Sequence, residues 1–249
     1  MAGHSHAANI KHKKALLDSK RGKLWGKLAK ALQVAARIGG GDPDANARLR
    51  LAILDAREAN MPKDTIERAI KKGTGELEGA EQIEEVLYEG YGPGGVAVLC
   101  EVLTDNRNRT APEIRKIFDV HDGKLAGANA VGWMFERKGI FVIPSDQVTE
   151  DRLMEIALEA GADDVKTVQG KFELTCDATQ WAAVSGALTA AGIQPEISQI
   201  GRIPKNIMEV DPDTARKAAK LLEALENHDD VQNVASNFNL PEEALAEQR

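Results

Sequence analysis

The stretch NIKHKKALLDSKRGKLWGKLAKALQVAARIGGG, residues 9–41, decides how the chain begins to fold. At about 100° per residue its lysines from residue 20 onward fall within one sector of a helical wheel. Leu24, Leu28 and Leu32 fill the neighbouring sector. One face of this helix is therefore predicted to pack, and the adjacent face to meet negative charge. We expect helices over residues 9–19 and 20–38, ended by the glycines at 39–41.

Two more helices are predicted before the first long polar segment. Asp42-Pro43 has the pattern of an N-cap followed by proline at the first helical position, which predicts a helix to about residue 59. Asn60 offers a left-handed cap, and a helix over 62–72 is predicted to close at Gly73. With the polar linker at 74–82, residues 1–79 are predicted to form a basic helical bundle.

The hydrophobic period then changes from helical to strand-like. Residues 83–89 and 96–103 read as strands joined by the glycine-rich loop 90–95. That loop matches G-x-G-x-x-G, but a dinucleotide site needs a helix directly after the glycines, so we reject that site. Thr110 and Glu113 predict a capping box for a helix over 111–121.

A repeating pattern of strands and helices follows. Residues 139–203 read as strand, helix, strand, strand, helix, strand, the βαββαβ order of ferredoxin-like domains. A later helix (212–227) and strand (231–235) are predicted to complete the sheet begun at Ile83, and residues 131–135 are predicted to add a strand to it.

The predicted fold class is therefore α+β. A helical bundle is followed by two α/β sandwich domains, one of them ferredoxin-like and inserted in the other. The expected boundaries are 1–79 for the bundle, 80–138 with 205–249 for the middle domain, and 139–204 for the insert.

The net charge of −7 hides a division along the chain. Residues 1–72 hold 16 Lys and Arg residues against 7 Asp and Glu residues, a net charge of +9, whereas residues 73–249 carry −16. The first part suits phosphate groups, and the rest would repel them. We predict a nucleic-acid-binding surface made of Lys11, Lys13, Lys14, Lys20, Arg21, Lys23, Lys27, Lys30, Arg37, Arg107 and Arg109.

Other readings of this charge were weighed. A charged helix face is most often only solvated. Aromatic residues make up 4% of the chain, which argues against a stacking platform for single strands, and no helix-turn-helix spacing supports base readout. Arg107 and Arg109 precede a predicted helix N-terminus, which favours anions, although a well-formed loop explains them equally well.

No residue pattern indicates catalysis, a cofactor or a metal site. The chain lacks a phosphate-binding loop, a zinc-protease motif and paired cysteine motifs. Cys100 and Cys176 lie in apolar runs and are expected to be buried thiols in a reducing compartment. With no apolar run of membrane-spanning length, a cytoplasmic protein without membrane contact is expected.

Several motifs together resemble the YebC/PmpR family along almost the whole chain. They are Gly3-His4-Ser5, Ala8–His12, Gly39–Pro43, Asn60-Met61, Tyr88–Gly95 and Asp105–Thr110. The family usually has Lys-Trp after Gly-His-Ser, where this chain has His6-Ala7, so any contact made there by relatives is in question. The resemblance implies a helical N-terminal bundle and two α/β domains.

The resemblance also implies function. Bacterial members are described as DNA-binding transcriptional regulators, whereas mitochondrial relatives activate translation of cytochrome c oxidase. We therefore predict a non-enzymatic, DNA-binding transcriptional regulator. The first alternative is a translation factor that binds ribosomal or transfer RNA, and the second is a protein-interaction scaffold. The acidic α/β domains are expected to meet a protein partner or a second copy of the chain.

Overall fold

The computed structural model describes residues 21–78, 82–168 and 170–239, with the side chain of Arg21 outside the description. Contacts divide the chain into two compact units. One contains the helical bundle and the first sheet, and the other contains the second sheet. Within the described residues both sheets have four strands, and helices and strands are mixed, so the fold class is α+β as predicted.

Three helices form the bundle: α2 (Arg21–Gly39), α3 (Ala47–Glu58) and α4 (Lys63–Thr74). Leu32, Ala35 and Ala36 of α2 are buried against α3 and α4, which confirms the apolar face. Gly73 lies inside α4, where a Cβ would collide with the Gln33 carbonyl oxygen of α2. The predicted end of α4 at Gly73 is therefore wrong, and left-handed Gly75 caps the helix.

Helix α3 begins later than Asp42-Pro43 indicates. Its N-cap is Asn46, whose Oδ1 accepts from the Leu49 N–H at 3.0 Å. The Asn46 side chain also donates to the carbonyl oxygens of Ala35 and Gly40, each at 2.8 Å. Asp42 caps only a local turn, accepting from the Asp44 N–H. A buried side chain that satisfies three backbone groups thus outcompetes an exposed cap.

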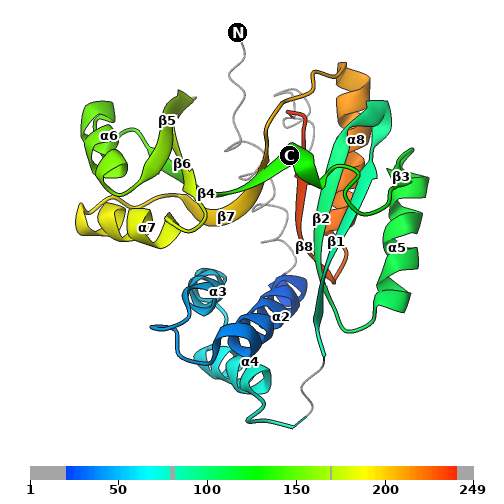
Figure 1. Cartoon of the computed structure of the whole chain (residues 1–249), viewed down its shortest axis with the longest axis horizontal. Helices are drawn as coiled ribbons and strands as arrows, with labels where there is room; N and C mark the ends of the chain where they lie inside the picture. The colour runs from blue at the N-terminus through cyan, green and yellow to red at the C-terminus, as the bar shows by residue number, and fades with distance from the viewer. Residues whose placement is uncertain (1–20, 79–81, 169, 240–249) are drawn as a thin grey trace. The chain divides into compact units, whose positions relative to one another are not determined.

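The first sheet has the order β3-β1-β2-β8 (Figure 1). Its strands are β1 (Glu84–Tyr91), β2 (Ala97–Thr104), β3 (Lys124–Leu125) and β8 (Val231–Ser236). β1 and β2 form the predicted antiparallel hairpin, and because a strand follows the glycine loop, the rejection of a dinucleotide site is confirmed. The late strand β8 joins this sheet as predicted.

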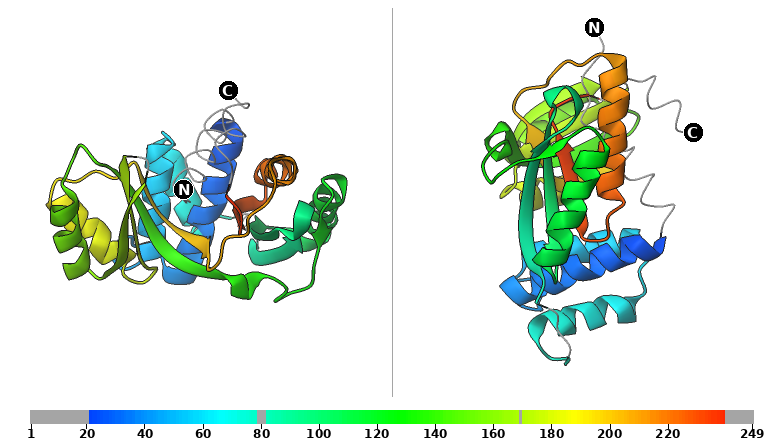
Figure 2. Two further views of the ribbon diagram at one scale, coloured as in Figure 1. Left: turned by 90° about the horizontal axis from the view of Figure 1, so that it is seen from above. Right: turned by 90° about the vertical axis from the view of Figure 1, so that its right-hand side faces the viewer.

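Two helices cover one face of this sheet: α5 (Arg107–Val120) and α8 (Pro212–Glu226) (Figure 2). Phe118 of α5 lies against Gly90, and Leu221 of α8 lies against Gly92. The glycines of the loop and of the adjoining strand end are therefore places where helix side chains approach the backbone, where any Cβ would crowd them.

The second sheet has the order β5-β6-β4-β7. Its elements are β4 (Phe135–Pro144), α6 (Glu150–Glu159), β5 (Ala162–Val168), β6 (Lys171–Asp177), α7 (Trp181–Ala190) and β7 (Ile197–Pro204). This chain order and strand order are those of the predicted ferredoxin-like arrangement, with all named pairs antiparallel. Phe141 stacks on Trp181 of α7, with ring centroids 6.1 Å apart.

One predicted strand is wrong. Residues 132–134 form a short 3-10 turn, and Phe135 begins β4 of the second sheet. The buried Glu89 carboxylate accepts from the backbone N–H groups of Asn129, Val131 and Gly132 at 2.6–2.8 Å. These bonds hold the segment as a loop, because donors that meet a carboxylate are not available to a strand ladder.

The two cysteines are buried free thiols, as the sequence indicates. Burial raises the pKa of the Cys176 thiol to about 11.

Candidate nucleic-acid interface

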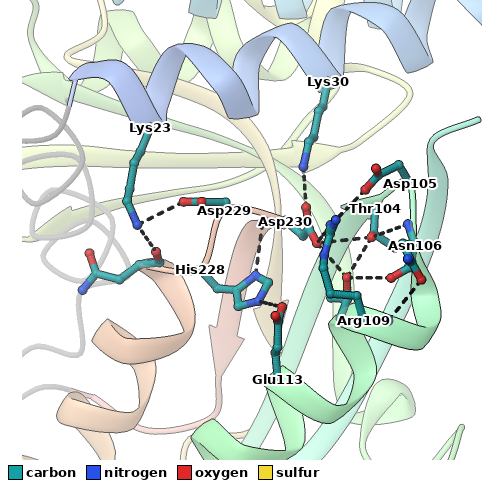
Figure 3. Close-up of polar contacts among 12 residues, drawn as sticks. Lys23, Lys30, Thr104, Asp105, Asn106, Arg109, Glu113, His228, Asp229 and Asp230 are labelled. Carbon is teal, nitrogen blue, oxygen red and sulfur yellow. Dashed lines mark hydrogen bonds and ion pairs between the residues drawn. The ribbon is translucent and has the colours of Figure 1, made fainter. Parts of the chain in front are cut away.

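The lysine face of α2, which we define as Lys23, Lys27 and Lys30, lies beside the end of α8 and the turn that follows it (Figure 3). The spacing i, i+4, i+7 places these three side chains on one side of the helix. They contact residues about 200 positions later in the chain, which a helical wheel alone cannot show.

The last carbonyl groups of α8 receive two of these lysines. Lys27 Nζ donates to the Glu226 carbonyl oxygen at 2.6 Å, and Lys23 Nζ donates to that of Asn227 at 3.2 Å. Lys23 also lies 3.0 Å from Asp229 Oδ1. The C-terminal carbonyls of a helix lack intrahelical partners and carry the negative end of its dipole, so cations are favoured there.

Lys27 is nearly inaccessible, with 5% of its surface exposed. Burial disfavours the charged ammonium and lowers the pKa of Lys27 to about 8, although Glu226 and Asp229 oppose the shift. The structure therefore holds a desolvated cation in the middle of the predicted binding surface.

Asp230 is the centre of the contact network and is 2% exposed. It forms an ion pair with Lys30 of α2. Its Oδ2 accepts from Thr110 Oγ1 at 2.6 Å, from Arg109 Nη2 at 2.7 Å and from Thr104 Oγ1 at 3.2 Å. Burial by itself would raise the pKa of Asp230, but the hydrogen bonds from Lys30, Thr110 and Arg109 hold it well below its usual range.

His228 adds a fixed hydrogen-bond link to the same turn. Its Nδ1 accepts from the Asp230 N–H at 3.1 Å, and its Nε2 lies 2.9 Å from Glu113 Oε2. Together these two contacts assign the proton to Nε2, which donates to the carboxylate of α5. The turn between α8 and β8 is thus bound by α2 on one side and by α5 on the other.

Arginines of the bundle contact the start of β1. Arg37 Nη2 donates to the Ile83 carbonyl oxygen at 2.6 Å, and Arg48 pairs with Glu85 at 2.8 Å. Arg107 pairs with Glu84 at 3.5 Å from the side of α5. A small apolar cluster of Val34, Ile83 and Leu103 lies between these charged contacts.

The second predicted anion site differs from its sequence pattern. Helix α5 begins at Arg107 with Asn106 as its N-cap, so both arginines lie in its first turn rather than before it. The predicted capping box is wrong, because the buried Thr110 hydroxyl instead bonds Asp230 and the Asn106 carbonyl oxygen. Hydrogen bonds from Arg109 to Asp230 and Asp105 raise the pKa of Arg109, and it stays charged.

The structure thus brings together four of the eleven predicted cations, Lys23, Lys27, Lys30 and Arg109, around residues 226–230. Arg37 and Arg107 lie instead at the start of β1. Lys11, Lys13, Lys14, Lys20 and the side chain of Arg21 lie outside the described residues. Sequence reasoning missed Asp230 as the hub, although the run His228-Asp229-Asp230 carried a signal: adjacent polar residues just before a buried strand.

Among the described residues, no three His, Cys, Asp or Glu side chains are grouped as metal ligands. No helix within the described ranges has the length and apolar character needed to cross a membrane.

Comparison with known proteins identifies relatives over the full architecture. Residues 5–76 match the model of the TACO1/YebC protein N-terminal domain, and residues 83–238 match that of the TACO1/YebC second and third domain. A probable transcriptional regulatory protein of Rhodopirellula baltica is 51% identical over 99% of this chain and 100% of its own. One from Desulfotalea psychrophila is 53% identical, with 98% of each chain covered.

The structural comparison agrees. The crystal structure of a conserved hypothetical protein from Aquifex aeolicus superimposes with a TM-score of 0.84 at 49% sequence identity, covering 95% of this chain and 98% of the other. The chain therefore belongs to the TACO1/YebC family, whose curated members bear the name of probable transcriptional regulatory proteins.

Proposed function

We propose that this protein is a non-enzymatic regulator of gene expression that binds duplex DNA through its basic helical bundle. The observation that carries the proposal is the lysine face of α2. Its three ammonium groups all meet negative or partly negative oxygen atoms, two carboxylates and two carbonyls, within one turn of chain. A face arranged to hold such oxygens suits phosphate groups.

The charge of the bundle supports the same function. Residues 1–72 carry a net charge of +9, and four further cations precede α2 at residues 11–20. Contacts of lysine with phosphates are independent of base sequence, so they would set affinity and position rather than site choice. The transcriptional name shared by the curated relatives makes DNA the first ligand to test.

Folded RNA is the second candidate ligand. It is favoured by the −16 charge of residues 73–249, since a strongly acidic body is a poor neighbour for long DNA but tolerates a compact RNA surface. In this version the bundle binds ribosomal or transfer RNA, and the protein acts on translation. A protein-interaction scaffold, the third candidate, requires no nucleic acid at all.

The test compares two variants that lose the same positive charge. The first replaces by glutamine four lysines at the start of the bundle: Lys13, Lys14, Lys20 and Lys23. It leaves Lys27 and Lys30 in place, because both contact the sheet domain. The matched control replaces four exposed cations elsewhere: Arg115, Lys116, Lys124 and Lys220.

Binding to a 20-base-pair duplex and to purified ribosomes is measured across a salt series. We expect the bundle variant to lose affinity and to show a salt dependence shallower by ~0.9 log units per lost duplex contact, with the control unchanged. Tight, salt-sensitive binding to ribosomes with weak binding to DNA would replace the DNA proposal by the RNA one. If the parent binds neither ligand, the scaffold remains and the proposal is overturned.

A further inference from the structure

We propose that the turn at the end of α8, residues 226–230, competes with nucleic acid for the lysine face of α2, so that a polyanion binds this face only as the turn is released. The inference rests on the proposed function and adds a regulation to it. The turn acts as an internal substitute for phosphates, and the bundle is held in a self-occupied state until a stronger anion is present.

Occupancy of the lysine face is the first argument. Lys27 is 5% exposed, and the side chain of Lys30 is 20% exposed. Both ammonium groups already have a partner in the turn, Lys27 the Glu226 carbonyl and Lys30 the Asp230 carboxylate. A phosphate oxygen can therefore reach these two groups only if the turn moves away from α2.

The contacts are unequal in a way that directs where they break. Asp230 has three donors on its own side of the contact, Arg109, Thr110 and Thr104, besides Lys30 of α2. After separation from Lys30 it remains hydrogen-bonded, and no unpaired buried carboxylate results. The ion pair of Lys23 with Asp229 has side chains 50% and 70% exposed, so salt and solvent weaken it.

Release also relieves a cost on the side of α2. Lys27 is charged at neutral pH in a desolvated position, and its lowered pKa reports that its ammonium is less favourable there than in water. When the turn is released, this group regains water or gains a phosphate. A polyanion that offers several phosphates at once can therefore displace a turn that offers two carboxylates and two carbonyls.

The first experiment removes the charge of the competitor. In the Asp229→Asn/Asp230→Asn variant both side chains keep their size, and we expect affinity for a 20-base-pair duplex at 0.1 M salt to rise at least about threefold. The control variant, Asp146→Asn/Glu159→Gln, removes two exposed acids of the other unit and corrects for net charge. Equal affinity of the two variants, both folded by circular dichroism, would overturn the inference.

The second experiment uses the unmodified chain. A water-soluble carbodiimide joins an amine to a carboxylate only when the two are in contact, and Lys23 lies 3.0 Å from Asp229. We expect this cross-link in the free protein, detected by peptide mass spectrometry, and its loss when the duplex saturates the protein. The pair Lys138–Asp163 in the other unit, at 2.9 Å, is the internal control and should cross-link in both states.

The outcomes separate the two ideas. If the duplex binds and the Lys23–Asp229 cross-link persists at saturation, the competition is wrong while the proposed function stands. If neither the parent nor the Asp229→Asn/Asp230→Asn variant binds the duplex or a folded ribosomal RNA fragment, the proposed function fails and the competition fails with it. If only the RNA fragment binds and only it abolishes the cross-link, the competition holds for RNA.

Discussion

Single residues decide how α2 is used. The helical wheel treats Lys23, Lys27 and Lys30 as equivalent, yet in the structure Lys23 is half-exposed, Lys27 is buried and Lys30 is paired with a buried aspartate. Their chemistry differs accordingly. A buried lysine with a lowered pKa penalises the folded state while it is charged, whereas an exposed one does not.

We expect the stability of the chain to report the burial of Lys27. Below pH 8 the amine is protonated in both the folded and the unfolded chain, and the cost of its burial is fully present. Between pH 8 and the ordinary lysine pKa of about 10.5, the folded state releases the proton first, so stability rises with pH. The parent should therefore gain about 2 kcal/mol relative to Lys27→Met between pH 7 and 9.5.

Urea unfolding of both proteins at the two pH values checks this, since titrations elsewhere in the chain cancel in the difference. Lys63→Met is the matched control, because 86% of the Lys63 side chain is exposed and no such gain is expected. A parent-minus-variant difference that stays constant from pH 7 to 9.5 would mean that Lys27 is hydrated in solution.

At the scale of elements, the start of α3 shows how packing overrides a local signal. Asp42-Pro43 is a good helix-start pattern, but Asn46 can reach three backbone groups from one buried position. Gly39 makes this possible, since a Cβ there would lie 2.6 Å from the Asn46 amide nitrogen. The side chain therefore joins the end of α2 to the start of α3, and not merely one helix end.

We expect Asn46→Ala to destabilise the fold by about 2 kcal/mol or more, because it removes a cap and leaves two carbonyls and an N–H unpaired. Asp42→Ala should cost less than about 0.5 kcal/mol, since Asp42 is exposed and closes only a local turn. Thermal unfolding of the two variants gives the comparison. Equal losses would return the cap to Asp42.

At the scale of the whole molecule, we propose the domain boundaries that the sequence indicates: 1–79, 80–138 with 205–249, and 139–204. The inserted segment has its own sheet, and its entry and exit strands pair with each other, Arg137 opposite Arg202. Paired antiparallel residues have Cα atoms about 5 Å apart, a gap that a short linker spans.

Excision therefore tests the boundaries. Joining residues 137 and 202 through two glycines should leave a folded remainder in which the first sheet and the Asp230 network persist. We expect a single cooperative thermal transition and a retained Lys23–Asp229 cross-link. A remainder that is unfolded by circular dichroism would show that the inserted segment supports the rest of the chain.

The sequence alone determined what depends on local period and composition. The packing face of α2, the left-handed Asn60, the hairpin around residues 90–95 and the βαββαβ order all follow from side chains a few positions apart. So does the basic character of the first 72 residues.

Tertiary structure alone decided which partners these residues meet. Lys30 and Asp230 are 200 positions apart, Asn46 replaces Asp42 because α2 supplies carbonyls, and residues 131–135 leave the first sheet because Glu89 takes their N–H groups. In each case a buried polar group took the donors or acceptors that could satisfy it after collapse. That choice depends on the proximity of distant segments, which no local pattern encodes.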